Sequence, residues 1–266
     1  MSIHHVEPVM GTVISIDLVG SHDRDLLARV VHWFHSVDDV FSPYKESSII
    51  TAIGRGRVAL DHPAVGSDVH DVLARCEALR VRTDGVFDVW RLPSPNGTSF
   101  DPCGYVKGWS VQAAADMVTD AGVSDFCINA GGDVAVAGRN HDGRPWRVGV
   151  RHPHDPGALA FVVLTERPLA VATSGTYERG AHIVDPRTGE RCAEIASVTV
   201  VGRDLGEVDG LATAVFAMGL GGIDWLSQQP DVEGCAITHD LRVLATPGFG
   251  RHLASTVAVC PSSSSS

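Results

Sequence analysis

Helical and strand-like patterns fall into separate blocks along this chain, and their order limits the folds open to it. Residues 10–19 alternate and are rich in β-branched side chains, which predicts a strand. Apolar residues then recur at helical spacing over residues 22–41, 64–83 and 104–121. Strand patterns dominate after residue 125. Strict alternation of strands and helices would indicate a doubly wound parallel sheet, so the block order favours an α+β fold.

The strand-rich part contains one more helical pattern, at residues 208–218. The strands expected there are residues 126–129, 134–137, 146–150, 159–164, 169–173, 196–201, 235–238 and 242–245. No Pro-, Gly- or Ser-rich linker divides the chain, which predicts a single domain over residues 1–260. The Ser-rich end, residues 261–266, is predicted to be a disordered tail.

The charge of the chain excludes one large class of partners. Its 266 residues carry 21 Lys and Arg against 32 Asp and Glu, a net charge of −11. No Lys/Arg cluster offsets this total, so binding to a nucleic-acid backbone is not expected. A small phosphate ligand remains compatible, because a metal ion or a few backbone N–H groups supply positive field locally.

Three features of the sequence indicate the compartment. No apolar run approaches the roughly 20 residues that span a bilayer, so no integral membrane segment is expected. The first residues show no secretory signal and no Cys that could carry a lipid, which predicts a cytoplasmic protein. The six cysteines form no C-x-x-C pair, which indicates buried, reduced thiols rather than a zinc ribbon or a redox dithiol.

Two Gly-containing stretches combine polar side chains with backbone that a ligand can approach. Residues 129–133, Asn-Ala-Gly-Gly-Asp, lie between two expected strands. They are typical of a tight hairpin, although paired glycines also admit a ligand. Residues 84–88, Asp-Gly-Val-Phe-Asp, place Phe87 either against an aromatic ligand or in the core, and the core is the commoner place.

His182 is the one histidine inside a dense polar motif. It follows a stretch rich in hydroxyl groups, residues 172–177, and precedes Asp-Pro-Arg-Thr-Gly at residues 185–189. That second stretch is typical of a type I turn. An imidazole with a pKa near about 6.5 can move a proton at neutral pH, so His182 is a candidate general base.

Two pairs of polar residues lie at the starts of expected helices. Asp209 and Thr213 are four residues apart, so they share a helix face, and their oxygens suit a hard cation such as Mg²⁺. Taken alone, the pair is explained better by a capping Asp near a helix N-terminus and a Thr bonded to its own turn. Near the start of another helix, Lys107 follows Asp101 and either meets an anion or is solvated.

Several common motifs are missing from the sequence. It has no G-x-G-x-x-G between strand and helix, no P-loop, no H-E-x-x-H and no G-x-S-x-G. The sequence therefore gives no motif support for four enzyme classes: dinucleotide dehydrogenases, P-loop enzymes, zinc proteases and α/β-hydrolases.

In their order, the polar stretches resemble the ApbE family, the FAD:protein FMN transferases. The matching residues are Met10 to Thr12, Phe41 to Tyr44 with Ser47 and Ser48, Gly85 to Asp88, Asp101 with Gly104, Lys107 and Gly108, Asn129 with Gly131 to Asp133, Thr173 to Gly175 with Tyr177, His182 with Asp185 to Gly189, Ser197 to Val200, and Asp209 to Thr213. The ordered set, from about Glu7 to Gly219, is specific although each part is weak. The resemblance implies an ApbE-like α+β fold with mixed or antiparallel sheets and packed helices.

The resemblance also implies a reaction and a site. FMN would move from FAD onto a threonine hydroxyl of an acceptor flavoprotein in the presence of Mg²⁺, with release of AMP. Asp209, Thr213 and the Gly104 carbonyl would bind Mg²⁺, and His182 would be the general base. The flavin and adenosine sites would be lined by Met10, Tyr44, Val86, Phe87, Asp88, Asp101, Lys107 and Ile183.

One departure from the family pattern keeps two alternatives open. Between Trp90 and Asp101 the chain has only the short loop RLPSPNGTSF, where a longer segment is expected. A more open site would admit water, so a metal-dependent FAD pyrophosphatase that forms FMN and AMP is one alternative. The other is a non-catalytic FAD-binding protein.

Overall fold

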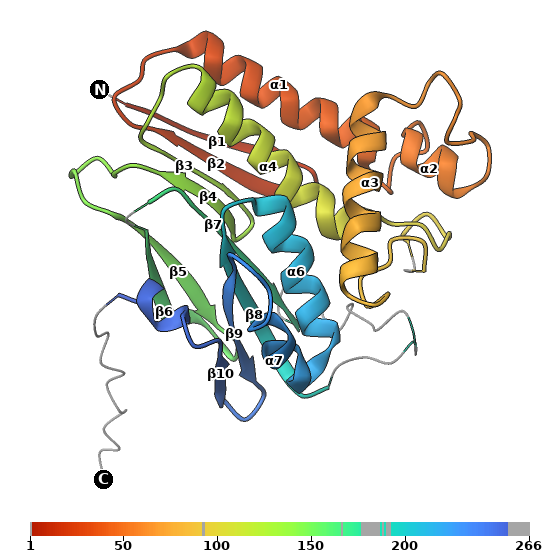
Figure 1. The fold of residues 1–266 in the computed structure, drawn as a ribbon. Helices are drawn as coiled ribbons and strands as arrows, with labels where there is room; N and C mark the ends of the chain where they lie inside the picture. The colour runs from red at the N-terminus through yellow and green to blue at the C-terminus, as the bar shows by residue number, and fades with distance from the viewer. Residues whose placement is uncertain are drawn as a thin grey trace.

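An antiparallel sheet of eight strands forms the centre of the protein (Figure 1). The computed structural model describes residues 2–91, 94–165, 167–176, 187, 189 and 193–254. The strand order is β1-β2-β3-β4-β7-β8-β9-β10, and every neighbouring pair is antiparallel. The bounds are β1 Ile3–Val9, β2 Thr12–Leu18, β3 Phe126–Ala130, β4 Asp133–Ala137, β7 Leu169–Gly175, β8 Ile195–Gly202, β9 Glu233–Thr238 and β10 Val243–Ala245. The predicted α+β class is confirmed.

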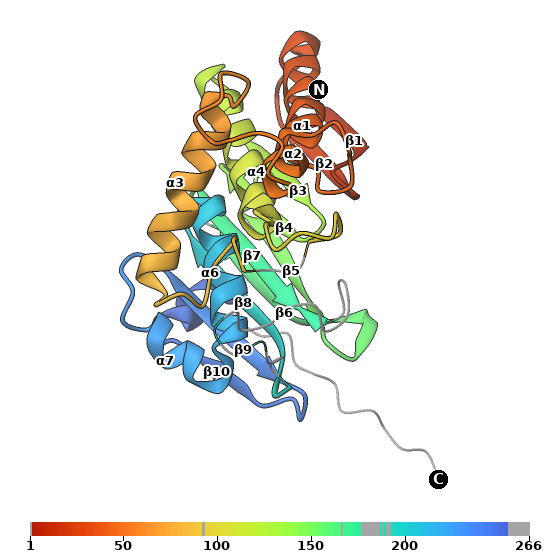
Figure 2. The ribbon, with the colours of Figure 1, turned by 90° about the vertical axis from the view of Figure 1, so that its right-hand side faces the viewer.

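Helices cover one face of this sheet (Figure 2). The long helices α1 (Arg24–Phe41), α4 (Cys103–Asp120) and α6 (Leu205–Ala217) contact strands directly, and so does a short helix, α7 (Gly222–Leu226), which contacts β9. An outer helix, α3 (Ser67–Arg82), packs on α4 and α6, and two short helices, α2 (Ile49–Gly54) and α7, flank the layer. Short 3₁₀ turns lie at Gly219–Gly221 and Phe249–His252. The main core therefore lies between helices and sheet, with fully buried side chains such as Phe34, Val198 and Leu211.

A separate hairpin covers part of the other face. Its strands are β5 (Trp146–His152) and β6 (Asp155–Thr165). Val148 and Val163 of this hairpin pack on Val136, Val171 and Val201 of the large sheet. Strand β8 therefore has packing on both faces, and this explains its almost uninterrupted apolar sequence.

The predicted strand at residues 10–19 is wrong at its start. Met10 and Gly11 form the turn between β1 and β2, and both have a left-handed backbone, with φ of 57° and 68°. Two-residue hairpins favour such angles because the turn then matches the twist of the strands. Strand β1 was not predicted because its residues are largely polar and include Pro8. An edge strand such as β1 tolerates both features.

The last long helix begins earlier than its pattern predicts. Its N-cap is Asp204, whose Oδ1 accepts the Glu207 amide at 2.8 Å. Asp209 is therefore one turn inside the helix, not at its start, and the helix-capping explanation for Asp209 is wrong. Helix α6 is buried on almost all sides, so its apolar residues show no clean stripe that would mark the first turn.

Cysteines and membrane segments were also predicted from the sequence. None of the four described cysteines, Cys76, Cys103, Cys127 and Cys235, forms a disulfide bond, and burial raises the pKa of Cys76 and of Cys127 to about 12. The other two cysteines, and the tail at residues 261–266, lie outside the described residues. Within the described part of the chain, no helix has the length and apolar character to cross a membrane.

Candidate active site

Two turns and the last residues of β7 lie at the same end of the sheet's strands, and the two turns contact the first half of α4. The turn between β1 and β2 contacts α4 through Met10, whose Sδ accepts a hydrogen bond from Ser110 Oγ at 3.7 Å. The turn between β3 and β4 lies beside it, because the Gly131 amide donates to Val13 O at 3.3 Å. The end of β7 reaches the same edge through the pairing of β4 with β7. Residues that are far apart in sequence therefore lie close together at this end of the strands.

Helices α4 and α6 bring the three predicted metal ligands together. Asp209 is 5% exposed, and its Oδ2 accepts the Gly108 amide at 2.9 Å. Thr213 Oγ1 would lie 3.8 Å from a Cβ added to Gly104, so that hydroxyl faces the first turn of α4. Ser174 Oγ, from β7, is 3.4 Å from Thr213 Oγ1. A carboxylate, two hydroxyl groups and backbone therefore lie close together.

The oxygen atoms at this crossing suit a hard cation. Mg²⁺ prefers oxygen ligands, uses one or two carboxylates and completes its coordination with water and substrate phosphate. Within the described ranges, no three His, Cys, Asp or Glu side chains are grouped to hold a metal ion. A site with Asp209 as its carboxylate would thus depend on phosphate and water, as Mg²⁺ sites commonly do.

Lys107 forms an ion pair, so of the two alternatives that the sequence left open the structure shows contact with an anionic group. Its Nζ lies 2.6 Å from Asp133 Oδ2, at the first residue of β4. The Thr173 amide donates to Asp133 Oδ1 at 3.2 Å, and Thr173 Oγ1 is 2.9 Å from Thr199 Oγ1. The predicted tight hairpin at residues 129–133 is confirmed. Its Asp is a buried ionic partner as well as the residue after the turn.

The segment before α4 places Phe87 in the core. Phe87 is 1% exposed, and its ring contacts that of Tyr105 edge-on at 6.5 Å. It also lies beside Gly104, where an added Cβ would be 3.6 Å from the ring. Val86 is buried as well. The Phe87 ring therefore packs against the start of α4, and its place in the core is confirmed.

Asp88 and Asp101 shape the two ends of the short loop before α4. The buried Asp88 accepts the Trp90 amide at 2.9 Å, and Asp101 accepts the Cys103 amide at 2.9 Å. The Asp101 amide donates to Val89 O at 2.8 Å, so the two ends lie side by side. Each carboxylate thus has a local backbone partner at the entrance to α4.

Three predicted residues are not placed in this group. Tyr44 follows α1, is 71% exposed and has an amide that donates to Ser42 Oγ at 3.4 Å. The predicted general base, His182, and its neighbour Ile183 lie outside the described residues. Their roles stay predictions.

Asp133, Ser174 and Gly108 lie in the motifs that resemble the family, but none of them was predicted to bind a ligand or a metal or to act in catalysis. Asp133 stood in a turn motif, where an Asp is expected for local reasons. Only its partner Lys107, 26 positions away, shows a second role. The sequence indicates even less about Gly108. A glycine inside a helical pattern does not identify the second helix that packs against it.

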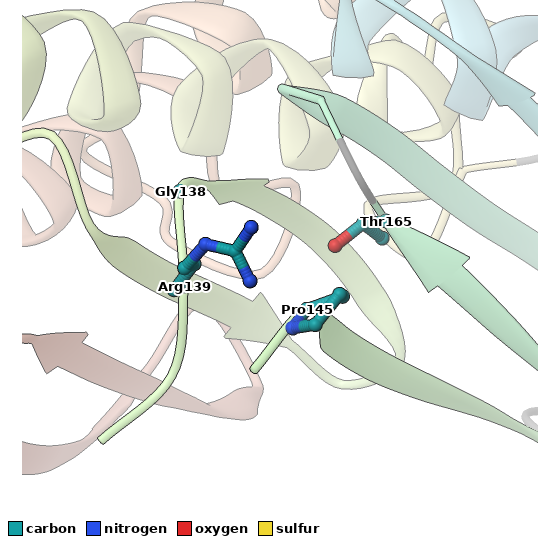
Figure 3. A pocket seen from close by; sticks show the side chains of 4 residues that line it. All are labelled: Gly138, Arg139, Pro145 and Thr165. Carbon is teal, nitrogen blue, oxygen red and sulfur yellow. The ribbon is translucent and has the colours of Figure 1, made fainter. Parts of the chain in front are cut away.

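A pocket lies away from the predicted metal ligands, between the end of β4 and the β5–β6 hairpin (Figure 3). It has a volume of about 330 Å³ and is lined by Gly138, Arg139, Pro145 and Thr165. Gly138 follows the last residue of β4, whereas Asp133 is the first. The pocket and the Lys107–Asp133 pair are therefore at opposite ends of this strand.

Comparison with known proteins places this geometry in a family. A model of the ApbE family matches residues 10–93 and 90–236. A protein of Vibrio cholerae named FAD:protein FMN transferase is 34% identical over 273 residues, which cover 82% of this chain and 81% of that protein. One of the same name from Treponema pallidum is 27% identical over 247 residues, 84% of this chain and 67% of that protein.

Solved structures show the same fold. The flavin transferase ApbE from Vibrio cholerae aligns with a TM-score of 0.82 at 22% identity, over 95% of this chain and 99% of that chain. At this identity the structural match speaks for the fold alone. Together with the family model and the 34% identical relative, it leads to one conclusion: this chain belongs to the ApbE family.

Proposed function

We propose that this chain is a Mg²⁺-dependent FAD:protein FMN transferase. It would move FMN from FAD onto a threonine hydroxyl of an acceptor flavoprotein and release AMP. The observation that carries the proposal is the meeting of Asp209, Thr213 and Gly104 between α4 and α6 in a member of the ApbE family. Relatives named FAD:protein FMN transferase match most of the chain.

The proposed reaction asks mainly for positioning and charge neutralisation. The acceptor Thr oxygen forms a bond to the FMN-side phosphorus, the bond from that phosphorus to the bridging oxygen breaks, and AMP leaves with the electron pair. The Thr proton would pass to His182. Mg²⁺, when bound, would neutralise charge on the diphosphate. Asp209 and Thr213 would hold it by their oxygens, together with the Gly104 carbonyl.

Lys107 would supply fixed positive charge beside the same edge. Its side chain is 25% exposed, so the lysine can contact a ligand while it remains paired with the buried Asp133. Met10, Tyr44, Val86, Phe87, Asp88, Asp101 and Ile183 are the further proposed contacts to FAD. Because Phe87 and Val86 are buried, their proposed contribution is the shape of the pocket floor.

A labelling experiment tests the transferase activity. The protein is incubated with FAD, Mg²⁺ and an acceptor flavoprotein domain, and covalent flavin fluorescence is read in a denaturing gel. Labelled acceptor and an equal amount of AMP are expected. The acceptor with its target Thr changed to Ala is the control and stays unlabelled. Unlabelled authentic acceptors in the presence of bound FAD would rule out the transferase.

The short loop before α4 supports FAD pyrophosphatase as the second candidate. Residues 94–100 fold into a tight turn in which the Ser94 amide donates to Thr98 O at 2.9 Å. The ring of Trp90 stacks on Phe100, with centroids 4.2 Å apart. The compact loop leaves less chain to exclude water. AMP formed without any acceptor would support hydrolysis, and FAD binding without AMP under either condition would support a non-catalytic FAD-binding protein.

The sequence-based prediction of a cytoplasmic location belongs to this proposal too. It is tested by fractionating cells that express the full chain and probing each fraction with an antibody. Recovery of the protein outside the cytoplasmic fraction would contradict it.

A further inference from the structure

Helices α4 and α6 approach each other closely at Gly108. A Cβ added to Gly108 would lie 2.3 Å from Leu205 O and 2.7 Å from Asp209 Cβ. Real Cβ atoms do not approach other atoms so closely, so the crossing accepts no side chain at this position. The absence of a side chain lets the carboxylate of Asp209 reach the backbone of α4.

At this approach the Gly108 amide donates to Asp209 Oδ2 at 2.9 Å. In a regular α-helix, the amide of residue i donates to the carbonyl of residue i−4. The helical partner of the Gly108 amide is therefore the Gly104 carbonyl, which is one of the proposed Mg²⁺ ligands. A hydrogen bond to a carboxylate is stronger than one to a neutral acceptor, so Asp209 competes well for this donor.

We infer that Gly108 is a positioning residue for the cation site, an inference that rests on the proposed function. Its amide orients the carboxylate of Asp209. The same hydrogen bond draws the donor away from the Gly104 carbonyl, so that oxygen keeps electron density for a cation. One backbone N–H thus couples two proposed ligands from different helices. Groups that orient metal ligands commonly change metal affinity by about 10- to 100-fold when they are lost.

Gly206 provides a matched control at the same helix crossing. A Cβ added there would lie 3.1 Å from Trp109 Cα and 3.2 Å from Trp109 N, so Gly206→Ala also crowds α4 against α6. The three atoms nearest to that Cβ belong to Trp109 and, at 3.2 Å, to Oδ1 of the N-cap Asp204, and none of them belongs to Asp209 or Gly104. Both Gly108→Ala and Gly206→Ala are expected to lower stability, and only Gly108→Ala disturbs the hydrogen bond to Asp209.

The test is Mn²⁺ binding with FAD present and no acceptor, measured by electron paramagnetic resonance. We expect Gly108→Ala to bind Mn²⁺ at least about tenfold more weakly than the unmodified protein. Gly206→Ala is expected to stay within about twofold, a packing change only. Equal losses in both variants, or unchanged binding in Gly108→Ala, would overturn the inference alone. No Mn²⁺ binding by the unmodified protein would sink the proposed function, and the inference with it.

A spectroscopic measurement keeps the inference testable if Gly108→Ala does not fold. In protein labelled with ¹⁵N-glycine, the Gly108 amide gives one cross-peak among those of 28 glycines. It is expected to move when Asp209→Asn removes the charge from its acceptor, and again when Mg²⁺ and FAD are added to the unmodified protein. A cross-peak that stays in place in both experiments would overturn the coupling.

Discussion

Lys107 Nζ lies 2.6 Å from Asp133 Oδ2, and this ion pair joins α4 to the first residue of β4. The two partners differ in exposure, with 1% of the Asp133 side chain and 25% of the Lys107 side chain accessible. The Thr173 amide holds the other oxygen of Asp133. The buried acid is therefore a fixed anchor, and the lysine is the partner that can face a ligand.

Asp133→Asn tests this anchor. Asparagine keeps an acceptor for the Thr173 amide and removes the charge that holds Lys107. FAD affinity is expected to fall about tenfold, equivalent to about 1.4 kcal/mol, because the cation is no longer positioned. Quenching of flavin fluorescence measures the affinity. Glu77→Gln is the control, since it removes the acid of an exposed pair with Arg80 on α3. Tighter FAD binding would show instead that Asp133 competes with FAD for Lys107.

Asp209 is tested with two variants that separate its charge from its hydrogen bond. Asp209→Asn retains an acceptor for the Gly108 amide, whereas Asp209→Ala removes this acceptor and leaves the amide with its helical partner, the Gly104 carbonyl. Both variants are expected to lose metal-dependent AMP release while the fold persists. Asp209→Ala should be less stable than Asp209→Asn by about 0.5–1.5 kcal/mol in urea unfolding. Near-normal rates in either variant would remove Asp209 from the metal site.

Thr213 offers a nearly isosteric test of a single hydroxyl. Thr213→Val keeps the shape beside Gly104 and removes the oxygen that lies 3.4 Å from Ser174 Oγ. The Mg²⁺ concentration for half-maximal AMP release is expected to rise at least about tenfold, as for other lost metal-site groups. Thr213→Ser, which keeps the hydroxyl, is expected to resemble the unmodified protein. An unchanged Mg²⁺ dependence in Thr213→Val would exclude the hydroxyl as a ligand.

Glu7, on β1, is expected to make the free energy of unfolding depend on pH. It bridges His5 on β1 and His35 on α1, at 2.9 Å each. These hydrogen bonds hold the pKa of Glu7 below its usual range. The stabilisation is thus present above the unfolded pKa of about 4.3 and is lost as the pH falls through the lower folded value.

Glu7→Gln measures this contribution. The substitution is expected to lower the free energy of unfolding at pH 7 by about 0.5 kcal/mol, because the pair is near the surface and screened by solvent. The difference should shrink as the pH falls from 7 and vanish at an acid pH at which Glu7 is protonated in both the folded and the unfolded state. Urea unfolding at the two pH values measures it. A difference that grows as the pH falls would contradict the assigned pKa direction.

Two glycines with left-handed backbones separate strain from a steric clash. Gly138 has a φ of 61°, and a Cβ there would be 2.2 Å from Asp125 Oδ1 and 2.6 Å from Ser124 O. Gly143 has a φ of 71° and nothing within 4 Å of such a Cβ. Gly143→Ala is expected to cost about 1 kcal/mol. Gly138→Ala should cost at least about 1 kcal/mol more. Equal urea midpoints for the two variants would show that the backbone around Gly138 shifts to relieve the clash at little cost in stability.

The sequence was informative wherever the controlling interactions are local. The helix expected at residues 104–121 is α4, Cys103–Asp120, because helical periodicity is written into neighbouring residues. The same holds for Asp209 and Thr213, whose four-residue spacing places them on one face of any helix. Local patterns failed for β1 and the short α2, whose stability comes from an edge pairing and from packing on α1.

Strand order needed more than local patterns. Strand β4 is followed in sequence by β5, yet it pairs with β7, while β5 and β6 form a separate hairpin on the other face. Alternation along a strand identifies the buried face but not the neighbour. The partner is decided by which pairing buries both layers of the core.

The chain's own residue order thus determined the α+β class, the long helices and the residue types available for phosphate and metal chemistry. The tertiary structure alone decided that Lys107 meets Asp133 and that the Gly108 amide meets Asp209, 101 positions away. Such meetings follow from the packing of α4 on α6 and on the sheet, where a missing side chain sets how close two helices come. Periodicity carries no record of that distance, because it depends on atoms from both elements at once.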